Sequence, residues 1–327
     1  MTDAAASPAI VIIGRNEGER LRRCLASLPV DDTRVYVDSG STDGSQDHAR
    51  GLGVTVVDLD RTVGFTAARA RNAGLAVIRQ GAAIPEFVQM IDGDCALDPQ
   101  WMGKAVAALQ AEPGLAVVFG RRRERFPEHS LYNRQCDDEW NVPVGYVASC
   151  GGDAMFRLAA LSSVGDYNPD LIAGEEPELS VRLRAARWQI HCLDMPMTTH
   201  DAAITHWRQW WRRAKRSGYA FAQGAHLHGA PPERHWVRET RRAWLWGLLM
   251  PLAILSLAWT VGPVGLLFVA VYPLQMLRLY VLGSGSKRER ALKAVFNTLS
   301  RFPEVAGQLL YEWDCLMRRR GKLIEYK

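Results

Sequence analysis

Short apolar runs alternate with segments of helical spacing along the N-terminal part of the chain, and this alternation restricts the possible folds most strongly. The pattern predicts strands at residues 9–13, 33–38, 54–59, 87–91, 115–119 and 190–193. It predicts helices at residues 15–28, 67–80, 99–112 and 178–186, with a short helix after residue 45. Strands that alternate with helices indicate an α/β fold whose mostly parallel, Rossmann-like sheet is covered by helices on both faces.

Acidic and amide side chains fall where the predicted strands end. Asn16 follows the first strand and Asp38 ends the second, while Asp92 and Asp94 follow the apolar run that ends at Ile91. Ligands of open α/β sheets bind beyond the carboxyl ends of the strands. Residues two apart in an extended segment project to the same side, so we expect the carboxylates of Asp92 and Asp94 to converge. Convergent carboxylates favour Mg²⁺ or Mn²⁺ with open positions for phosphate oxygens, although an acidic turn after a strand gives the same pattern.

Several short motifs occur in a fixed order along the chain. They are Ile10–Glu17 (Ile-Val-Ile-Ile-Gly-Arg-Asn-Glu), Val37–Ser45, Ala70–Gly74, Asp92–Asp94, Gly151–Arg157 and Gly174–Leu179. As an ordered set within residues 1–215 they resemble the family 2 glycosyltransferases, and the set is more specific than any single motif. The resemblance implies a GT-A fold and an inverting enzyme that uses a nucleotide-diphosphate sugar as its donor.

The residue types and the resemblance together assign donor binding to side chains near the first four motifs. These are Asn16, Glu17, Asp38, Arg69, Arg71, Asn72 and Asp92. Asp38 would contact the nucleotide base, and an Asx-turn that organises its own loop is the alternative. Arg69 and Arg71 are candidates for pairing with diphosphate oxygens, or are helix arginines in solvent. Asn72 either holds the donor loop or hydrogen-bonds a turn.

Glu175 and Glu176 precede a predicted helix, whose N-terminus favours carboxylates whether or not they react. Family 2 enzymes place their general base in an equivalent acidic motif, commonly Glu-Asp, so the resemblance assigns the base to Glu176 in preference to Glu175. This chain departs from that motif by having Glu at the second position. His200, after the last predicted strand, is either a third ligand of the cation with Asp92 and Asp94 or a structural histidine. We expect Arg121–Arg123 to form a solvated loop, with contact to an acceptor phosphate as the alternative.

An uncharged run extends from Ala243 to Leu277, and its length suits a membrane. A spanning helix needs about 20 apolar residues, so the run predicts one long span or a hairpin that turns at residues 260–263. Basic residues flank the run on both sides, which favours a hairpin with both ends in the cytoplasm. A buried helical hairpin in a soluble domain is the alternative.

Four regions are expected in a chain of 327 residues. They are a GT-A glycosyltransferase domain (1–215), a basic and aromatic interfacial linker (216–242), a membrane helical hairpin (243–282) and a C-terminal helical cytoplasmic tail (283–327). Six cysteines without a Cys-x-x-Cys pair fit reduced thiols. The net charge of +5 does not indicate nucleic acid as a partner. We expect the protein at the cytoplasmic face of the inner (plasma) membrane, with a lipid-linked sugar or a surface polysaccharide as acceptor.

Two other functions are compatible with parts of the sequence. A haloacid-dehalogenase-like phosphoesterase also begins with an apolar strand and Asp-x-Asp, but Ala96 stands where that pattern expects Thr or Val. It also leaves the motifs at Asn16 and Asp38 unexplained. An inactive, membrane-anchored nucleotide-sugar-binding module is the second alternative, and the full set of acidic residues argues against it.

Overall fold

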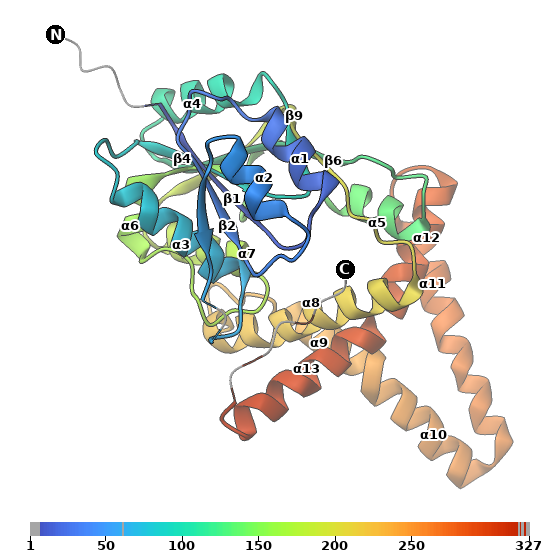
Figure 1. Cartoon of the computed structure of the whole chain (residues 1–327). Helices are drawn as coiled ribbons and strands as arrows, with labels where there is room; N and C mark the ends of the chain where they lie inside the picture. Colours follow the sequence, from blue (N-terminus) through green and yellow to red (C-terminus); the bar gives the residue numbers. More distant parts are fainter. Residues whose placement is uncertain (1–6, 61, 320, 322–323, 325–327) are drawn as a thin grey trace. The chain divides into compact units, whose positions relative to one another are not determined.

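The computed structural model describes residues 7–60, 62–319, 321 and 324. The chain folds into two compact units (Figure 1). The first unit comprises residues up to His129 together with Cys136–Ala203, and the second comprises Ser130–Gln135 and the residues from Ile204 onward. The predicted boundary at residue 215 therefore falls inside the second unit, within a long helix, α8 (Trp207–His228).

The first unit is built on one sheet of nine strands. The strands are β1 (Ala9–Gly14), β2 (Arg34–Asp38), β3 (Thr55–Asp58), β4 (Phe87–Asp92), β5 (Cys95–Leu97), β6 (Leu115–Glu124), β7 (Gly145–Tyr146), β8 (Ala154–Arg157) and β9 (Gln189–His200). Its helices are α1 (Glu19–Ser27), α2 (Ser45–Gly51), α3 (Ala67–Arg79), α4 (Trp101–Ala111), α6 (Leu158–Val164) and α7 (Glu175–Ala185), while α5 (Leu131–Glu139) crosses the boundary between the units.

The first half of the sheet is parallel and follows the apolar pattern of the sequence. Strands β3, β2, β1 and β4 lie in that order, with Ile13 opposite both Val37 and Asp92. The residues of β1 from Ala9 to Ile12 are completely buried, because helices cover both faces of the sheet. This register brings the carboxyl ends of β1, β2 and β4 to one edge.

The second half of the sheet is mixed. β8 is antiparallel to both β4 and β6, β9 runs parallel to β6, and β5 is antiparallel to β9. The short β7 pairs with β9. The sequence pattern does not predict β5, β7 or β8, because strands of two to four residues are too short to show an alternation of apolar and polar residues. β6 also continues to Glu124 through three arginines, so the predicted solvated loop at Arg121–Arg123 is wrong.

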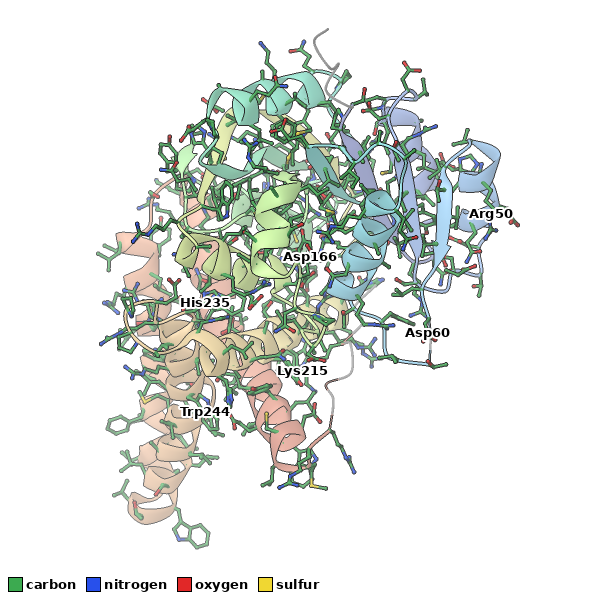
Figure 2. The ribbon with its side chains drawn as sticks, turned by 90° about the vertical axis from the view of Figure 1, so that its left-hand side faces the viewer. Arg50, Asp60, Asp166, Lys215, His235 and Trp244 are labelled. Carbon is green, nitrogen blue, oxygen red and sulfur yellow. The ribbon has the colours of Figure 1, made fainter. Side chains whose placement is uncertain are left out.

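The second unit is helical. Its helices are α8, α9 (Val237–Trp244), a π-helical turn (Leu245–Leu249), α10 (Met250–Val261), a 3₁₀ segment (Pro263–Ala270), α11 (Val271–Leu282), α12 (Lys287–Leu299) and α13 (Arg301–Leu316). Glycines allow α8 and α13 to pack closely, since a Cβ at Gly307 would lie 2.0 Å from the carbonyl oxygen of Lys215. Figure 2 labels Lys215 on α8 and Trp244 where α9 ends.

Two helical stretches of the second unit are long and apolar enough to cross a membrane by length and composition. They are Val237–Val261 and Pro263–Leu282, and only 11% and 6% of their most apolar windows are buried. Trp259, near the turn between them, is 88% exposed. Because the apolar side chains of these helices are mostly exposed, the helices do not form a buried hairpin of a soluble domain, which was the alternative from the sequence.

Candidate active site

Arg71 joins three carboxylates at the edge of the first unit's sheet. Its side chain is 2% exposed, and its guanidinium lies 2.9 Å from Asp92 Oδ1, 2.8 Å from Glu175 Oε1 and 2.7 Å from Glu176 Oε1. α3 carries Arg71 to this position because the small side chains of that helix pack against β1, where a Cβ at Gly74 would clash with Val11. The alternative of a solvated arginine does not hold for Arg71.

Glu176 is a carboxylate of this group whose acidity is strongly perturbed. It lies in the first turn of α7, and its side chain is only 12% exposed. Burial, followed by the neighbouring charge of Glu175, raises the pKa of Glu176 to about 8, against the opposing charge of Arg71. A carboxylate whose pKa lies near neutral pH is suited to accept a proton and release it again.

A second, partly buried arginine, Arg122 of β6, reaches the other side of Asp92. Its guanidinium lies 3.6 Å from Asp92 Oδ2 and 3.6 Å from Asp153 Oδ2, and it stacks over the Trp140 ring at 4.6 Å. Asp153 also accepts a hydrogen bond from the backbone N–H of Asp92. The Asp92 carboxylate is therefore held between two guanidinium groups.

Asp94 lies in different surroundings, two residues further along. β4 ends at Asp92, and Gly93 and Asp94 form a turn into β5. Asp94 Oδ2 is 3.3 Å from His200 Nε2, and Asp94 Oδ1 accepts from the Cys95 thiol at 3.6 Å. The potential ligand atoms of Asp94, Cys95 and His200 all lie within 4.8 Å of one another, and all three residues are buried. The structure thus brings Asp94 and His200 together and leaves Asp92 with the arginines.

Asp38 is buried in the loop that follows β2. Its Oδ1 accepts hydrogen bonds from the backbone N–H groups of Gly40 and Ser41 and from the Gln46 amide, and its Oδ2 accepts from Tyr36. Burial opposes ionisation, but these hydrogen bonds hold the pKa of Asp38 below its ordinary value. This geometry is the Asx-turn that the sequence offered as an alternative, and a base contact by Asp38 stays a prediction.

The remaining predicted donor-binding residues contact the backbone or a neighbouring side chain. Asn16 Oδ1 accepts from the Thr42 N–H, and Glu17 pairs with Arg20 at 2.7 Å. Arg69 donates to the carbonyl oxygens of Asp60, Val63 and Gly64, and Asn72 exchanges two hydrogen bonds with the backbone of Tyr167. Arg69 thus holds the loop near Asp60, which Figure 2 labels. Their donor roles stay predictions.

The backbone at Gly152 passes directly beside these carboxylates. A Cβ at this position would lie 2.7 Å from Arg71 Nη2, 3.0 Å from Asp92 Oδ2 and 3.3 Å from Glu176 Oε1. Gly151, its neighbour, has no atom within 4 Å of such a Cβ. The site therefore requires glycine at 152 for steric reasons that do not apply at 151.

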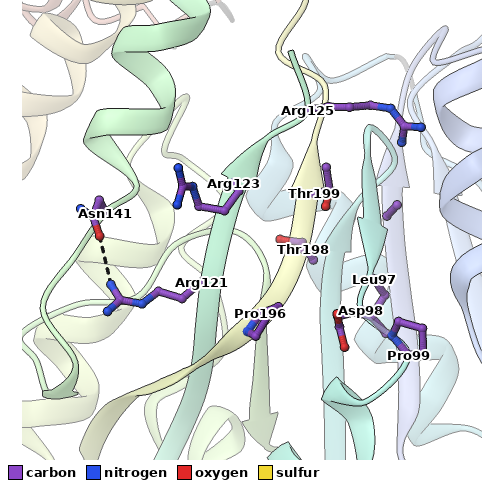
Figure 3. A pocket seen from close by; sticks show the side chains of 11 residues that line it. Leu97, Asp98, Pro99, Arg121, Arg123, Arg125, Asn141, Pro196, Thr198 and Thr199 are labelled. Atoms are coloured by element: carbon purple, nitrogen blue, oxygen red, sulfur yellow. Dashed lines mark hydrogen bonds between the residues drawn. The ribbon is translucent and has the colours of Figure 1, made fainter. Parts of the chain in front are cut away.

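A cavity of about 560 Å³ lies elsewhere in the same unit (Figure 3). Arg121, Arg123 and Arg125 line it, at and just beyond the end of β6. The residues between them point elsewhere: Arg122 contacts Asp92 and Asp153, and Glu124 contacts His200. Arg121 and Arg123 are paired with Asp194 and Asp137. Strand alternation therefore separates this cavity from the carboxylates.

Sequence reasoning missed four residues of the site: Trp140, Arg122, Glu124 and Asp153. Asp153 lies within the motif Gly151–Arg157, so this motif could have identified Asp153 as a residue of the site. Arg122 and Glu124 alternate with other charged residues in a strand that is polar on both faces, and no periodicity marks them.

Comparisons with known proteins agree on one family. Residues 9–147 match the model described as "Glycosyl transferase family 2". An uncharacterized glycosyltransferase of Mycobacterium tuberculosis (strain ATCC 25618 / H37Rv) is 29% identical over 190 residues, which cover 57% of this chain and 83% of that protein. The succinoglycan biosynthesis protein ExoA of Rhizobium meliloti (strain 1021) is 25% identical over 205 residues, or 58% and 61% of the two chains.

Solved structures share the fold at low sequence identity. The mannosyltransferase PcManGT from Pyrobaculum calidifontis, in complex with GDP-Man and Mn²⁺, is 17% identical with a TM-score of 0.57, and the match covers 95% of this chain and 88% of that one. S. aureus TarS (residues 1–349) is 14% identical with a TM-score of 0.51, over 94% and 91% of the chains. The predicted α/β fold of the GT-A type is confirmed, with the sheet mixed in its second half.

Proposed function

Residues 9–147 are a family 2 glycosyltransferase domain, and from this premise we propose an inverting transfer of a sugar from a nucleotide-diphosphate sugar. The acceptor is a lipid-linked sugar or a growing polysaccharide. The observation that carries the proposal is Glu176, a partly buried carboxylate with a pKa of about 8 that lies beside Arg71 and the backbone of Gly152.

Glu176 is the general base in this proposal. An acceptor hydroxyl bound next to Glu176 gives its proton to this carboxylate while its oxygen attacks the anomeric carbon of the donor. The nucleoside diphosphate departs from the opposite face, so the configuration at that carbon inverts. Arg71 holds Glu176 and Glu175 by ion pairs and opposes the rise in the pKa of Glu176, which keeps part of this base ionised near neutral pH.

Asp94 and His200 are the proposed protein ligands of Mg²⁺ or Mn²⁺. They fit such an ion because both are buried, their ligand atoms lie 3.3 Å apart, and carboxylate and imidazole are accepted by Mn²⁺. A divalent cation supplies charge neutralisation for a departing diphosphate. The mannosyltransferase PcManGT was solved with GDP-Man and Mn²⁺, which supports a nucleotide sugar and a divalent cation as ligands here.

Asp92 has a different role in the proposal from the direct metal ligation that its spacing predicted. Its carboxylate lies between Arg71 and Arg122, next to the base. We assign it to holding these two guanidinium groups at the donor edge of the sheet, where they face a diphosphate. Asn16, Glu17, Asp38, Arg69 and Asn72 then act by shaping the surrounding loops.

The second unit supplies the membrane contact. Its two apolar helices expose large side chains such as Trp259, and arginines lie at the start of the first of them, at 238, 241 and 242. Basic residues beside apolar helices favour the cytoplasmic leaflet. One relative, ExoA, is named for succinoglycan biosynthesis, which supports a polysaccharide or its lipid-linked precursor as the acceptor.

Binding and transfer test this proposal separately. The full-length protein in detergent is screened by thermal shift against nucleoside diphosphates with Mn²⁺, and the best nucleotide directs a transfer assay with membrane lipid extract. We expect Glu176→Gln to keep the nucleotide-dependent shift and to lose transfer. A protein that binds nucleotide sugars but neither transfers nor hydrolyses them is an inactive binding module, and release of phosphate from simple esters identifies a phosphoesterase.

A further inference from the structure

His200 is held between carboxylates on both of its ring nitrogens. Nε2 lies 3.3 Å from Asp94 Oδ2, and Nδ1 lies 3.2 Å from Glu124 Oε2. Glu124 is buried, and neither its position nor its charge marked it in the sequence. The side of the imidazole that faces away from Asp94 is thus occupied by a second carboxylate.

The sheet fixes this arrangement. His200 ends β9, with Glu124 of β6 directly opposite on one side and Cys95 of β5 opposite on the other. The N–H of Arg125 donates to the carbonyl oxygen of His200 at 2.7 Å. Trp140 packs its ring edge to face with the imidazole at 4.5 Å, so packing also limits rotation of the ring.

A neutral His200 carries one ring hydrogen and can donate to only one of its two carboxylate neighbours. When a cation is held beside Asp94, Nε2 must present its lone pair to that cation, so Nδ1 carries the hydrogen that Glu124 accepts. The lone pair of the neutral ring then lies on Nε2, which faces Asp94. An imidazole that donates through one nitrogen to a carboxylate and presents the other is the usual form of a histidine metal ligand.

We propose that Glu124 is the positioning residue that selects the tautomer of His200 and aims its Nε2 at the cation held with Asp94. The inference rests on the cation site of the proposed function. Glu124 itself does not touch the cation or the donor; it acts through the imidazole. Its two oxygens also accept from the N–H groups of Phe126 and Ala202, which hold the carboxylate in place.

Glu124→Gln is the informative change, because it keeps the size of the side chain and one acceptor oxygen. The single amide oxygen cannot accept both from the backbone N–H groups of Phe126 and Ala202 and from His200 Nδ1. If the NH₂ group turns toward Nδ1 instead, it stabilises the tautomer that carries its hydrogen on Nε2. Loss of a carboxylate that orients a ligating histidine typically weakens metal binding about 10–100-fold. We expect the Mn²⁺ dissociation constant of Glu124→Gln, measured by electron paramagnetic resonance in the full-length protein, to rise by that factor.

A matched control separates positioning from general loss of a buried charge. Glu178 is also buried and is paired with Arg182, and Glu178→Gln makes the same chemical change in α7. Glu178→Gln should lower the unfolding temperature without changing Mn²⁺ affinity. Glu124→Asp keeps the charge but retracts it, so it should give an intermediate affinity, and it serves as the test if Glu124→Gln does not fold.

The outcomes distinguish this inference from the proposed function. If His200→Ala and Asp94→Asn weaken Mn²⁺ binding while Glu124→Gln and Glu124→Asp leave it unchanged, Glu124 is not a positioning residue. If neither His200→Ala nor Asp94→Asn weakens it, the cation site itself is misplaced and the inference falls with it. Weakening by Glu124→Gln but not by Glu178→Gln supports the inference.

Discussion

Asp92 and Asp94 are two residues apart, yet their carboxylates contact different side chains. Asp92 contacts the buried Arg71 and the partly buried Arg122, and it adjoins the carboxylates of Glu175 and Glu176 through Arg71. Asp94 contacts an imidazole and a thiol. The difference arises because Asp92 ends β4 and Asp94 already lies in the turn to β5, so the two-residue alternation of a strand does not extend across the pair.

The comparison teaches that one short acidic motif can serve two parts of a reaction. In the proposed mechanism, the arginine-linked side (Arg71, Asp92, Glu175 and Glu176) holds the base, and the imidazole-linked side (Asp94 and His200) holds the divalent cation. Each prediction below alters one side and asks whether the other responds.

The largest effect is expected from Glu176→Gln on the arginine-linked side. Removing a positioned general base typically lowers kcat about 10²–10⁴-fold. Nucleotide and Mn²⁺ affinities should stay within error of the unaltered protein, as measured by thermal shift and electron paramagnetic resonance. Glu175→Gln is the control, with a smaller loss of kcat, and the reverse ranking would move the base to Glu175.

Next in size is the difference between the two aspartates themselves. Asp94→Asn should weaken Mn²⁺ binding by about 100-fold or more, since it removes a charged oxygen ligand of a hard cation. Asp92→Asn should change Mn²⁺ affinity by less than about threefold, because its carboxylate is paired with arginines. Equal losses in the two variants would show that both carboxylates ligate the ion.

The pH profile reports on the arginine-linked side alone. Glu176 must be ionised to accept a proton, and its pKa is about 8, so kcat/KM should rise with pH and level off near that value. Below the pKa the rise is about tenfold per pH unit. The charge of Asp92 raises the pKa of Glu176, so Asp92→Asn should shift the plateau to lower pH, whereas Asp94→Asn should leave its position unchanged. A profile already flat at pH 6 contradicts the assignment.

The same pKa affects stability with a definite sign. The ordinary pKa of a Glu carboxyl is 4.5, and in the folded protein that of Glu176 is about 8. Between these values the folded state binds more protons than the unfolded state, so the free energy of unfolding should fall as pH rises. Glu176→Gln should flatten that part of the profile, as followed by thermal unfolding.

Gly152→Ala is expected to have a smaller effect on the arginine-linked side. Its methyl group would push Arg71, Asp92 and Glu176 apart, and a displacement of about 1 Å can cost up to about 10²-fold in rate, so we expect a loss of roughly tenfold or more in kcat. Gly151→Ala is the matched control, since its methyl group meets nothing within 4 Å. Similar losses in both variants would point to loop flexibility rather than crowding.

The smallest effect is expected from Cys95→Ser on the imidazole-linked side. Burial raises the pKa of the Cys95 thiol well above its ordinary value, so it stays protonated and is a poor ligand for Mg²⁺ or Mn²⁺. The change should alter Mn²⁺ affinity and kcat by less than about threefold. A large loss, or a switch in the preferred metal, would add sulfur to the ligand set.

The sequence alone determined the first half of the sheet and the edge at which the site lies. The apolar runs of β1, β2 and β4 are buried on both faces, so burial requires apolar residues there and the pattern can be recognised in the sequence. The ends of those strands placed Asp38 and Asp92, and the motif order indicated the family. The same reasoning chose Glu176, whose role stays a prediction until the variants are measured.

Tertiary structure alone decided which side chains meet. Arg122, Glu124 and His200 come from strands whose partners lie far away in the chain, and β9 acquires its place only by pairing with β6 and β5. Charged residues at the polar end of a strand give no periodic signal in the sequence. Their neighbours are set by the pairing of strands that lie far apart in the chain. That pairing, and the turn that begins at Gly93, separates the two aspartates into an arginine-linked and an imidazole-linked side.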